Sequence, residues 1–305
     1  MRELVVISGK GGTGKTSVAA SFAVLADRPV IADCDVDAAD LHLVLTPRIR
    51  ERHELRSGRE ARILQEACTR CGACADHCRF DAIVADAHAG DASPRGGSTP
   101  SAPGPARVAL RVDPFSCEGC GVCYEVCPAG AVELSERVCG QWMISDTRCG
   151  PMVHARLGVG GENSGKLVSI VRREARRVAE DTGRTQIIVD GPPGLGCPVI
   201  ASIGGASQVL VVTEPTVAGA HDLERVLSLA RHFAVPTTVC VNRWDLNPEM
   251  TERIEAEALR AGVRAAGRIR YDRAVTLAQI QEKAVAELET PAAADLRRIW
   301  ENLEG

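Results

Sequence analysis

Eight of the 13 cysteines fall in two short runs with the same spacing. Four cysteines alone could bind Zn²⁺, but two tandem C-x2-C-x2-C-x3-C runs are diagnostic of iron–sulfur clusters, and in this arrangement the fourth cysteine of each run serves the other cluster. The sequence therefore predicts two 4Fe–4S clusters. The ligands of one are Cys68, Cys71, Cys74 and Cys127, and those of the other are Cys78, Cys117, Cys120 and Cys123.

A second motif, at residues 9–16, is built to hold phosphate and fits G-x-x-x-x-G-K-S/T. Backbone N–H groups of its glycines would cradle the phosphates, Lys15 would reach the β- and γ-phosphates, and the Thr16 hydroxyl would bind Mg²⁺. We therefore expect ATP and Mg²⁺ as ligands. The expected ATP-binding residues in this segment are Gly11, Gly12, Thr13, Gly14, Lys15, Thr16 and Ser17.

The same glycines also satisfy a rival pattern. Gly9, Gly11 and Gly14 fit G-x-G-x-x-G, and Asp33 follows about twenty residues later, where a dinucleotide fold places its ribose-binding acid. Two features favour the phosphate loop over a flavin- or nicotinamide-dependent reductase. A dinucleotide fold has no use for Lys15 and Thr16, and it leaves unexplained why Asp190, at the end of a predicted strand, precedes Gly-Pro-Pro-Gly.

The elements that must position these motifs follow from hydrophobic patterning. Short apolar runs typical of parallel strands buried on both faces alternate with helical patterns. We predict strands at 3–8, 29–33, 186–190, 208–212 and 236–241, and helices at 15–26, 220–233 and 248–261. This alternation predicts an α/β fold with a doubly wound, mostly parallel sheet.

The cysteine runs interrupt this pattern and repeat one another, since C-G-A-C in the first run matches C-G-V-C in the second. We expect an inserted α+β domain at 64–135 between two parts of one ATPase domain, 1–63 and 136–305. Within the insert, residues 85–107 are almost entirely Ala, Gly, Ser, Pro, Thr and Asp, which predicts a flexible loop.

Composition excludes several classes of protein. No apolar run in the 305 residues approaches the length of a bilayer span, and residues 2–7 form the first predicted strand, not a signal peptide. We therefore expect a cytoplasmic chain whose clustered cysteines bind metal, with no nucleic-acid partner. A C-terminal amphipathic pattern at 294–300 lacks the lysine-rich face of a membrane anchor, so we expect no such anchor.

The net charge of −4 is unevenly distributed. Residues 64–135 contain nine acidic and five basic residues, so the remainder of the chain is neutral. Small ferredoxin modules are often acidic without further meaning. An acidic insert would also attract a basic redox partner through long-range electrostatics, and the sequence leaves both interpretations open.

The glycine loop resembles the deviant Walker A loop of the group that contains MinD/ParA proteins, the arsenical pump ATPase and the nitrogenase iron protein. The resemblance implies that Lys10 reaches the nucleotide of a partner subunit. It also implies that Asp35, in a switch I segment, orients or deprotonates the attacking water, and that Asn242 contacts adenine. Asp190 to Gly194 resembles switch II, in which Asp190 holds Mg²⁺ through water and Gly194 senses the γ-phosphate.

More closely, the chain resembles MinD-superfamily ATPases of the SIMIBI type with an inserted two-cluster ferredoxin domain. The matching stretches are 35–37, 41–43, 162–168 and 213–216, and the last of these contains Glu214. The similarity covers essentially the whole chain except 85–107. Arg79 departs from the pattern, because the first run would often carry the proline that Pro128 supplies in the second.

Lys166 is a further candidate, because the chain has 32 Arg but only 4 Lys, and Lys10, Lys15 and Lys166 each follow a glycine. It either contacts phosphate or the switch region across a dimer, or lies on the solvated first turn of a helix. Cys197, just past switch II, is either a bridging cluster ligand or a packed thiol. We expect Cys34 and Cys240 to be core thiols, and we assign no role to Cys139 or Cys149.

These observations together predict an ATP-dependent homodimer in which the nucleotide state gates electron transfer through the clusters, between donor and acceptor proteins that the sequence does not name. One alternative is an Mrp-like ATPase that assembles or carries iron–sulfur clusters. The other is a spatial organiser like MinD.

Overall fold

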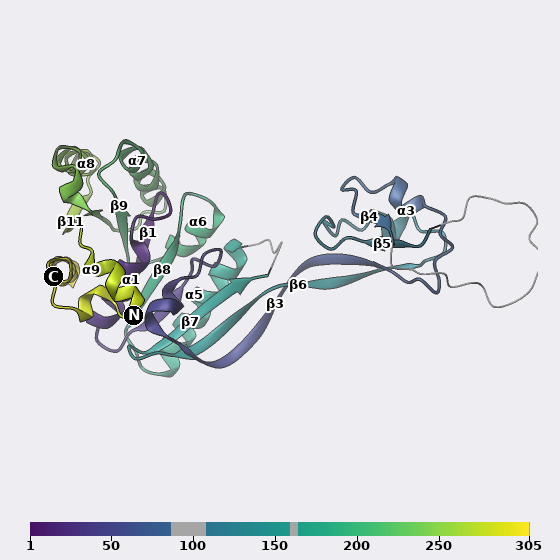
Figure 1. Ribbon diagram of the computed structural model, residues 1–305, viewed down its shortest axis with the longest axis horizontal. Helices are drawn as coiled ribbons and strands as arrows, with labels where there is room; N and C mark the ends of the chain where they lie inside the picture. Colours follow the sequence, from purple (N-terminus) through teal and green to yellow (C-terminus); the bar gives the residue numbers. More distant parts are fainter. Residues whose placement is uncertain (87–107, 159–163, 305) are drawn as a thin grey trace, which may run out of the picture. The chain divides into compact units, whose positions relative to one another are not determined.

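Among the residues that the structure describes, the larger sheet has nine strands in the order β11-β10-β9-β1-β8-β2-β7-β6-β3 (Figure 1). The pairings from β11 through β7 are parallel, and β6 pairs antiparallel with β7. The predicted α/β fold with a mostly parallel sheet is therefore confirmed. The strands are β1 (Arg2–Ser8), β2 (Val30–Asp33), β3 (Arg48–Ile63), β6 (Val132–Asp146), β7 (Pro151–Leu157), β8 (Gln186–Pro193), β9 (Gln208–Thr213), β10 (Thr237–Asn242) and β11 (Arg264–Ile269).

The computed structural model describes residues 1–86, 108–158 and 164–304. The chain forms two compact units, one of residues 1–55 with 140–305 and a second of residues 56–139. Both boundaries fall inside long strands, β3 and β6. Most of the predicted loop 85–107, namely 87–107, lies outside the described residues, as do Glu162 and Asn163 of the stretch 162–168.

Helices cover both faces of the sheet in the larger unit. Helices α1 and α10 pack against one face, whereas α5 and α6 contact β8 from the other. The predicted helices at 15–26, 220–233 and 248–261 are confirmed to within three residues at each end. The helices of this unit are α1 (Lys15–Leu25), α2 (Leu41–Leu45), α5 (Ser164–Asp181), α6 (Cys197–Ile203), α7 (Val217–His232), α8 (Pro248–Arg260), α9 (Ala274–Ile280) and α10 (Pro291–Glu304), with short 3₁₀ turns η1 (Trp244–Leu246) and η2 (Val285–Glu287).

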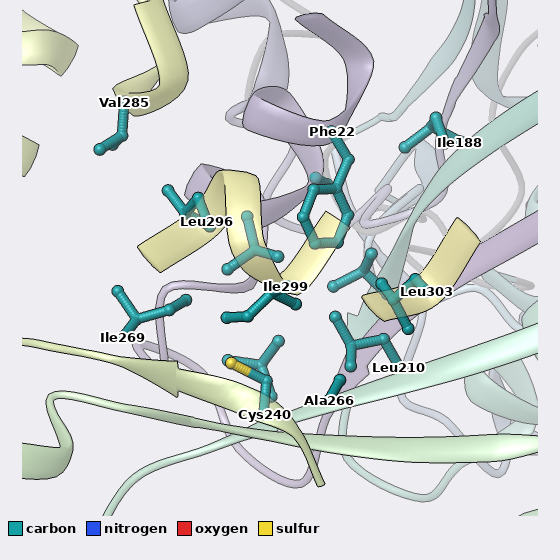
Figure 2. Close-up of a cluster of buried hydrophobic side chains, with 14 of the residues drawn as sticks. Phe22, Ile188, Leu210, Cys240, Ala266, Ile269, Val285, Leu296, Ile299 and Leu303 are labelled. Atoms are coloured by element: carbon teal, nitrogen blue, oxygen red, sulfur yellow. The ribbon is translucent and has the colours of Figure 1, made fainter. Parts of the chain in front are cut away.

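The main core lies between the sheet and the helices α1 and α10. Figure 2 shows Phe22 of α1 and Ile299 and Leu303 of α10 gathered over strand residues such as Leu210. The Trp300 ring packs on Phe22 with 5.1 Å between centroids. The amphipathic pattern at 294–300 is thus a core-facing helix, whose apolar residues are covered by the sheet. No described helix is long and apolar enough to cross a membrane.

Some elements differ from the prediction. Strand β8 does not end at Asp190 but continues to Pro193, which pairs with Ser8 after a register shift in β1. Strands β3, β6, β7 and β11 were not predicted. The sequence of β3 is rich in charged residues, and most of its side chains are exposed, so neither an apolar run nor a strict alternation marks it.

The parallel topology brings the functional loops together. Strands β1, β2, β8 and β10 run in one direction, so their carboxyl ends lie at one edge of the sheet, where α/β proteins bind ligands. The loops that follow these four strands contain the glycine loop, Asp35, Gly194 and Arg243.

Candidate functional site

The glycine loop joins β1 to the first turn of α1. Gly12 and Gly14 have φ of 81° and 88°, which favours glycine at both positions. A Cβ on Gly14 would lie 2.4 Å from Nδ2 of Asn242, so the backbone approaches this side chain too closely for any larger residue. Helix α1 begins at Lys15, and its N-terminal N–H groups are the anion-binding end of the helix.

A cavity of about 360 Å³ opens over this loop, in the size range of small-molecule sites. Its lining includes the predicted residues Gly11 to Ser17, Asp35 and Asn242. The sequence did not indicate a second group of lining residues, which come from β11 and the segment up to α9. They are Ile269, Arg270, Tyr271, Asp272, Val275, Thr276 and Gln279.

Lys15 lies at the centre of a buried charge cluster. Its Nζ lies 2.7 Å from Oδ1 of Asp190, 3.1 Å from Oδ2 of Asp35 and 3.4 Å from the Thr16 hydroxyl. Burial lowers the pKa of Lys15, but the carboxylates of Asp190 and Asp35 outweigh burial and raise this pKa above its usual value. The ammonium is therefore charged, and the structure brings together residues predicted for phosphate, water and Mg²⁺.

A third carboxylate lies beside this cluster. Asp33 is fully buried at the end of β2, and burial together with the charge of Asp190 raises its pKa well above the usual range. Burial also raises the pKa of Asp35, although Lys15 opposes the shift. Asp33 accepts a hydrogen bond from the Asp35 backbone N–H over 3.2 Å, so it fixes the chain that carries Asp35.

Three buried oxygens of this site have no hydrogen-bond partner among the described residues: Thr13 Oγ1, Asp33 Oδ2 and Asp190 Oδ2. Buried polar atoms are almost always paired, so unpaired ones call for a ligand or water. Carboxylate and hydroxyl oxygens are the ligands that Mg²⁺ prefers, and Mg²⁺ keeps several of its waters. Asp190 Oδ2 and the Thr16 hydroxyl thus fit a hydrated Mg²⁺ beside a phosphate.

Lys10 and Arg243, which follows β10, are linked through one carboxylate. Glu214 Oε2 lies 3.4 Å from Lys10 Nζ, and Glu214 Oε1 lies 2.6 Å from Arg243 Nη1. Next to Arg243, Asn242 donates a hydrogen bond over 2.7 Å to the Thr13 carbonyl oxygen. Glu214, which belongs to the stretch 213–216 noted in the sequence, therefore connects the glycine loop with the loop after β10.

The predicted switch II glycine is docked on the same loop. Gly194 has φ of 93°, and its N–H donates to the Ser8 carbonyl oxygen over 2.9 Å. The Ser8 hydroxyl in turn donates to the Lys10 carbonyl oxygen over 2.7 Å. A change in the position of Gly194 would therefore be transmitted to the start of the glycine loop.

Two further predicted residues lie elsewhere. Lys166 is exposed on the first turn of α5 and is not among the described residues that line the cavity. A Cβ built on Gly165 would lie 3.3 Å from Cβ of Cys197, so the start of α5 abuts the start of α6. Cys197 is exposed, and Cys34 and Cys240 are buried thiols as expected. A role for Lys166 or Cys197 remains a prediction.

The unit of residues 56–139 repeats its backbone with an offset of 49 residues. Helices α3 (Ala73–Asp76) and α4 (Val122–Glu125) each follow a left-handed glycine, Gly72 and Gly121. Two other positive φ values recur at matched positions, in Arg70 and Gly119 and in Asp81 and Gly130. The predicted internal repeat is therefore a structural repeat.

The two halves of the repeat exchange hydrogen bonds. The Leu64 N–H donates to the Ala131 carbonyl oxygen over 2.8 Å, and at matched positions the Asp113 N–H donates to the Ala82 carbonyl oxygen over 2.7 Å. Strands β4 (Ile83–Ala85) and β5 (Leu110–Val112) pair antiparallel. Each half thus closes on the other, which brings the end of one cysteine run toward the start of the other run.

Several members of each predicted cysteine set lie near one another. Cys78 lines one cavity together with Cys117, Cys120 and Cys123. In the other set, burial raises the pKa of the Cys74 thiol, and the nearby Cys68 and Cys127 raise it further. Backbone N–H groups donate to sulfur in that set, from Arg70 to Cys68 Sγ over 3.4 Å and from Ala131 to Cys127 Sγ over 3.2 Å.

Hydrogen bonds to sulfur are among the factors that set the potentials of iron–sulfur clusters in general. The described residues contain no group of three or more His, Cys, Asp or Glu side chains that could hold a metal ion. The iron–sulfur assignment therefore stays a prediction.

Comparison with known proteins decides the family. The model of the CobQ/CobB/MinD/ParA nucleotide binding domain matches residues 4–285. The chain belongs to this family. As a CobQ/CobB/MinD/ParA protein it is a P-loop ATPase of the MinD/ParA type, in agreement with the glycine loop and the Lys15 cluster.

Among curated proteins, the chain is 32% identical over 249 residues to uncharacterized protein MJ0578 of Methanocaldococcus jannaschii, with 80% of this chain and 79% of the relative covered. Among solved structures, the cell division ATPase MinD of Pyrococcus furiosus has 17% identity and a TM-score of 0.54, covering 99% of this chain and 98% of its own. The MinC:MinD cell division protein complex of Aquifex aeolicus has 15% sequence identity and a TM-score of 0.57, and the match covers 100% of this chain and 96% of that chain. These structures share the fold of the CobQ/CobB/MinD/ParA family member described here.

Proposed function

We propose that the chain is an ATP-hydrolysing, cytoplasmic iron–sulfur protein in which the nucleotide state gates electron transfer through two 4Fe–4S clusters. The observation that carries the proposal is the course of strand β6, which belongs to both units of the chain. It pairs with β7 of the nucleotide-binding unit at one end, and at the other end Val132 packs in a buried cluster with Cys74.

The nucleotide half of the proposal rests on the Lys15 cluster. On ATP binding, Lys15 would exchange the carboxylates of Asp190 and Asp35 for the β- and γ-phosphates. Asp35 would then be free to orient the attacking water, and Asn242 would contact adenine. When bound, Mg²⁺ would be held by Thr16 and, through water, by Asp190, and it would neutralise phosphate charge.

We further propose an ATP-dependent homodimer. The Lys10 side chain is 35% exposed, and its ammonium pairs with the rim carboxylate Glu214, so a short movement would free it to reach a second chain. Its role there would be to stabilise charge on the partner subunit's phosphate. MinD of Pyrococcus horikoshii has been solved with Mg-ADP, a precedent for the nucleotide and metal in this fold.

The cysteine half rests on the repeat at 64–135, which we propose to be an inserted ferredoxin domain. Cys68, Cys71, Cys74 and Cys127 would hold one cluster, and Cys78, Cys117, Cys120 and Cys123 the other. When bound, such clusters supply one-electron carriers, and their potentials depend on nearby charge and on hydrogen bonds to sulfur. Four ligands per cluster within one chain favour electron transfer over release of a cluster to an acceptor.

Coupling between the halves has a physical route in the sheet. Asp33 of β2 is in register with His154 of β7 on one side and with Asp190 of β8 on the other. His154 shares a hydrogen bond of 2.7 Å with Ser145 of β6. Movement of the segments that carry Asp35 and Asp190 on hydrolysis would therefore be transmitted to β6 through His154 and Ser145. A potential shift of roughly 200 mV corresponds to about 4.6 kcal/mol, similar to the ~5.5 kcal/mol of a full two-state shift.

Anaerobic potentiometry with EPR detection tests the proposal, on protein with ATP, with ADP and without nucleotide. We expect about eight iron and eight sulfide per chain and a nucleotide-dependent potential for at least one cluster. The Gly14→Ala variant, in which a methyl group would collide with Asn242, is the control and should show no nucleotide effect. A preparation that contains only zinc, or cluster reduction potentials that are the same with ATP, with ADP and without nucleotide, would contradict the proposal.

A further inference from the structure

The two cysteine loops, residues 68–79 and 117–128, share a backbone conformation. The side chains that differ between them therefore indicate how their surfaces differ in binding. Matched positions 49 residues apart pair Arg70 with Gly119 and Arg79 with Pro128. The first loop thus has two arginines that the second lacks. At another matched pair the first loop has Thr69 and the second has Glu118. Residues 117–128 contain two acidic residues and no basic one.

The second loop also exposes large apolar side chains where the first has alanine. Val122 is 43% exposed and Tyr124 is 50% exposed, and their counterparts are Ala73 and Ala75. Phe80, just after Cys78, is 43% exposed as well. The chain has only nine Phe, Trp and Tyr residues, and three of them, Phe80, Phe115 and Tyr124, are exposed in the unit of residues 56–139, which is a marked concentration.

These apolar groups surround one cysteine set. Phe80, Val122 and Glu118 line the same cavity as Cys78, Cys117, Cys120 and Cys123. Tyr124 follows Cys123 on α4, and Glu125 follows Tyr124. The surface around this set therefore combines an apolar centre of Phe80, Val122 and Tyr124 with a rim in which the exposed Glu118, Glu125 and Asp81 outnumber the one arginine, Arg79. Such a centre with a polar rim is the anatomy of a protein interface.

We propose that this surface, defined by Phe80, Glu118, Val122, Tyr124 and Glu125, is the docking site of a small basic electron-carrier protein. The acidic rim would attract a partner whose own apolar centre is ringed by Lys and Arg. The same charges disfavour two other occupants. A second copy of this acidic chain would place like charges opposite one another, and an anionic membrane surface would repel the rim.

This inference rests on the proposed function, because a partner docked here would receive electrons only if Cys78, Cys117, Cys120 and Cys123 hold a cluster. It assigns the contact with a basic partner to the set of Cys78, Cys117, Cys120 and Cys123, whose cavity is not lined by Arg70. The assignment concerns binding, so it can be measured without turnover.

The test is binding of the full chain to cytochrome c, a small basic haem protein, measured by isothermal titration calorimetry at low and high salt. Glu118→Gln with Glu125→Gln, and separately Tyr124→Ser, should each weaken binding about tenfold at low salt, which corresponds to about 1.4 kcal/mol. The effect of the charge variant should disappear at high salt, where exposed charges are screened. Acidic flavodoxin is the control probe and should not bind.

Matched variants on the first loop sharpen the test. Asp76→Asn is the counterpart of Glu125→Gln, and Ala75→Ser is the counterpart of Tyr124→Ser; both should change binding less than twofold. Equal losses on the two loops, or no loss in the second-loop variants, would overturn the docking site. Iron and sulfide are assayed on the same samples. Absence of clusters overturns the proposed function alone, whereas intact clusters with unaltered binding overturn this inference alone.

Discussion

The ammonium of Lys15 lies 2.7 Å from the carboxylate of Asp190, in a site where neither side chain is more than 6% exposed. The residue predicted to bind phosphate is therefore also the counter-ion of the residue predicted to hold Mg²⁺. Asp35 lies on the same ammonium at 3.1 Å. If Lys15 binds the phosphates as proposed, it must leave these two carboxylates, and phosphate binding would then be linked to movement of the segments that carry Asp35 and Asp190.

Lys15→Met should destabilise the protein as well as abolish ATP hydrolysis. Removing the ammonium leaves the carboxylates of Asp190 and Asp35 without their cation, and breaking a buried pair typically costs about 3–5 kcal/mol. Urea unfolding followed by circular dichroism should show a loss of this order. A variant with full stability would contradict the account of the cluster.

Lys10→Met is the matched control for that measurement. Lys10 is paired with Glu214 at 3.4 Å on the surface, and exposed ion pairs contribute about 0–1 kcal/mol. The free energy of unfolding should therefore change by less than about 1 kcal/mol. ATP hydrolysis should nevertheless fall strongly if Lys10 completes the site of a partner subunit. The Lys15 variant would then lose both stability and hydrolysis, and the Lys10 variant would lose hydrolysis alone.

Gly14→Ala should lower nucleotide affinity at least tenfold. The added Cβ would lie 2.4 Å from Nδ2 of Asn242, and the residue would keep a φ of 88° that disfavours alanine. Equilibrium dialysis with ATP measures the loss. Gly58→Ala carries similar backbone strain, at a φ of 74°, but its Cβ would meet no described atom within 4 Å. If Gly58→Ala weakened ATP binding equally, general destabilisation would explain both variants.

The sequence predicted the central sheet because its strands are buried on both faces, as the run of Gln208–Thr213 shows. It did not predict β3, an edge strand beside β6 in which charged and exposed side chains give no apolar pattern and only a few side chains, such as Ala61 and Ile63, are buried. The internal repeat was visible in the cysteines. Only some of its left-handed backbone positions could be predicted from glycines, since Arg70 and Asp81 adopt in the first run the positive φ that Gly119 and Gly130 adopt in the second.

Within the site, the motifs predicted which residues line the nucleotide cavity but not how they pair. Lys15 and Asp190 are 175 residues apart, so their contact depends on the adjacency of β1 and β8. Arg270 and Asp272 belong to no motif. They line the cavity only because β11 extends the sheet beside β10 and ends at the same edge.

Ile299→Ala should cost about 2–5 kcal/mol of unfolding free energy, because Ile299 is 1% exposed and fills the core between α10 and the sheet. Arg298→Ala, on the exposed side of the same helix, is the control and should be close to neutral. Both variants can be compared by urea unfolding. Equal stability of the two variants would mean that α10 does not pack against the sheet as described. The alternative of a MinD-like spatial organiser with a membrane-binding helix would then be tested by liposome sedimentation.

His154 should make the protein less stable in mild acid. Burial, with smaller effects of His42 and Arg52, lowers the pKa of His154 from 6.5 to about 4. Between these values the unfolded chain binds a proton that the folded chain does not, so the free energy of unfolding falls as pH falls from about 6.5 toward 4. At 1.36 kcal/mol per pKa unit, the loss reaches up to about 3 kcal/mol.

His154→Gln should remove this part of the pH dependence, since glutamine cannot titrate and can still pair with the Ser145 hydroxyl, which lies 2.7 Å from Nε2 of His154. The measurement is the difference in unfolding free energy between variant and parent at pH 7, 6 and 5, in which all other titrating groups cancel. The difference should shift in favour of the variant as pH falls. Parallel pH curves for the parent and His154→Gln would show that His154 is not held neutral, and that its bond to β6 is not protected from acid.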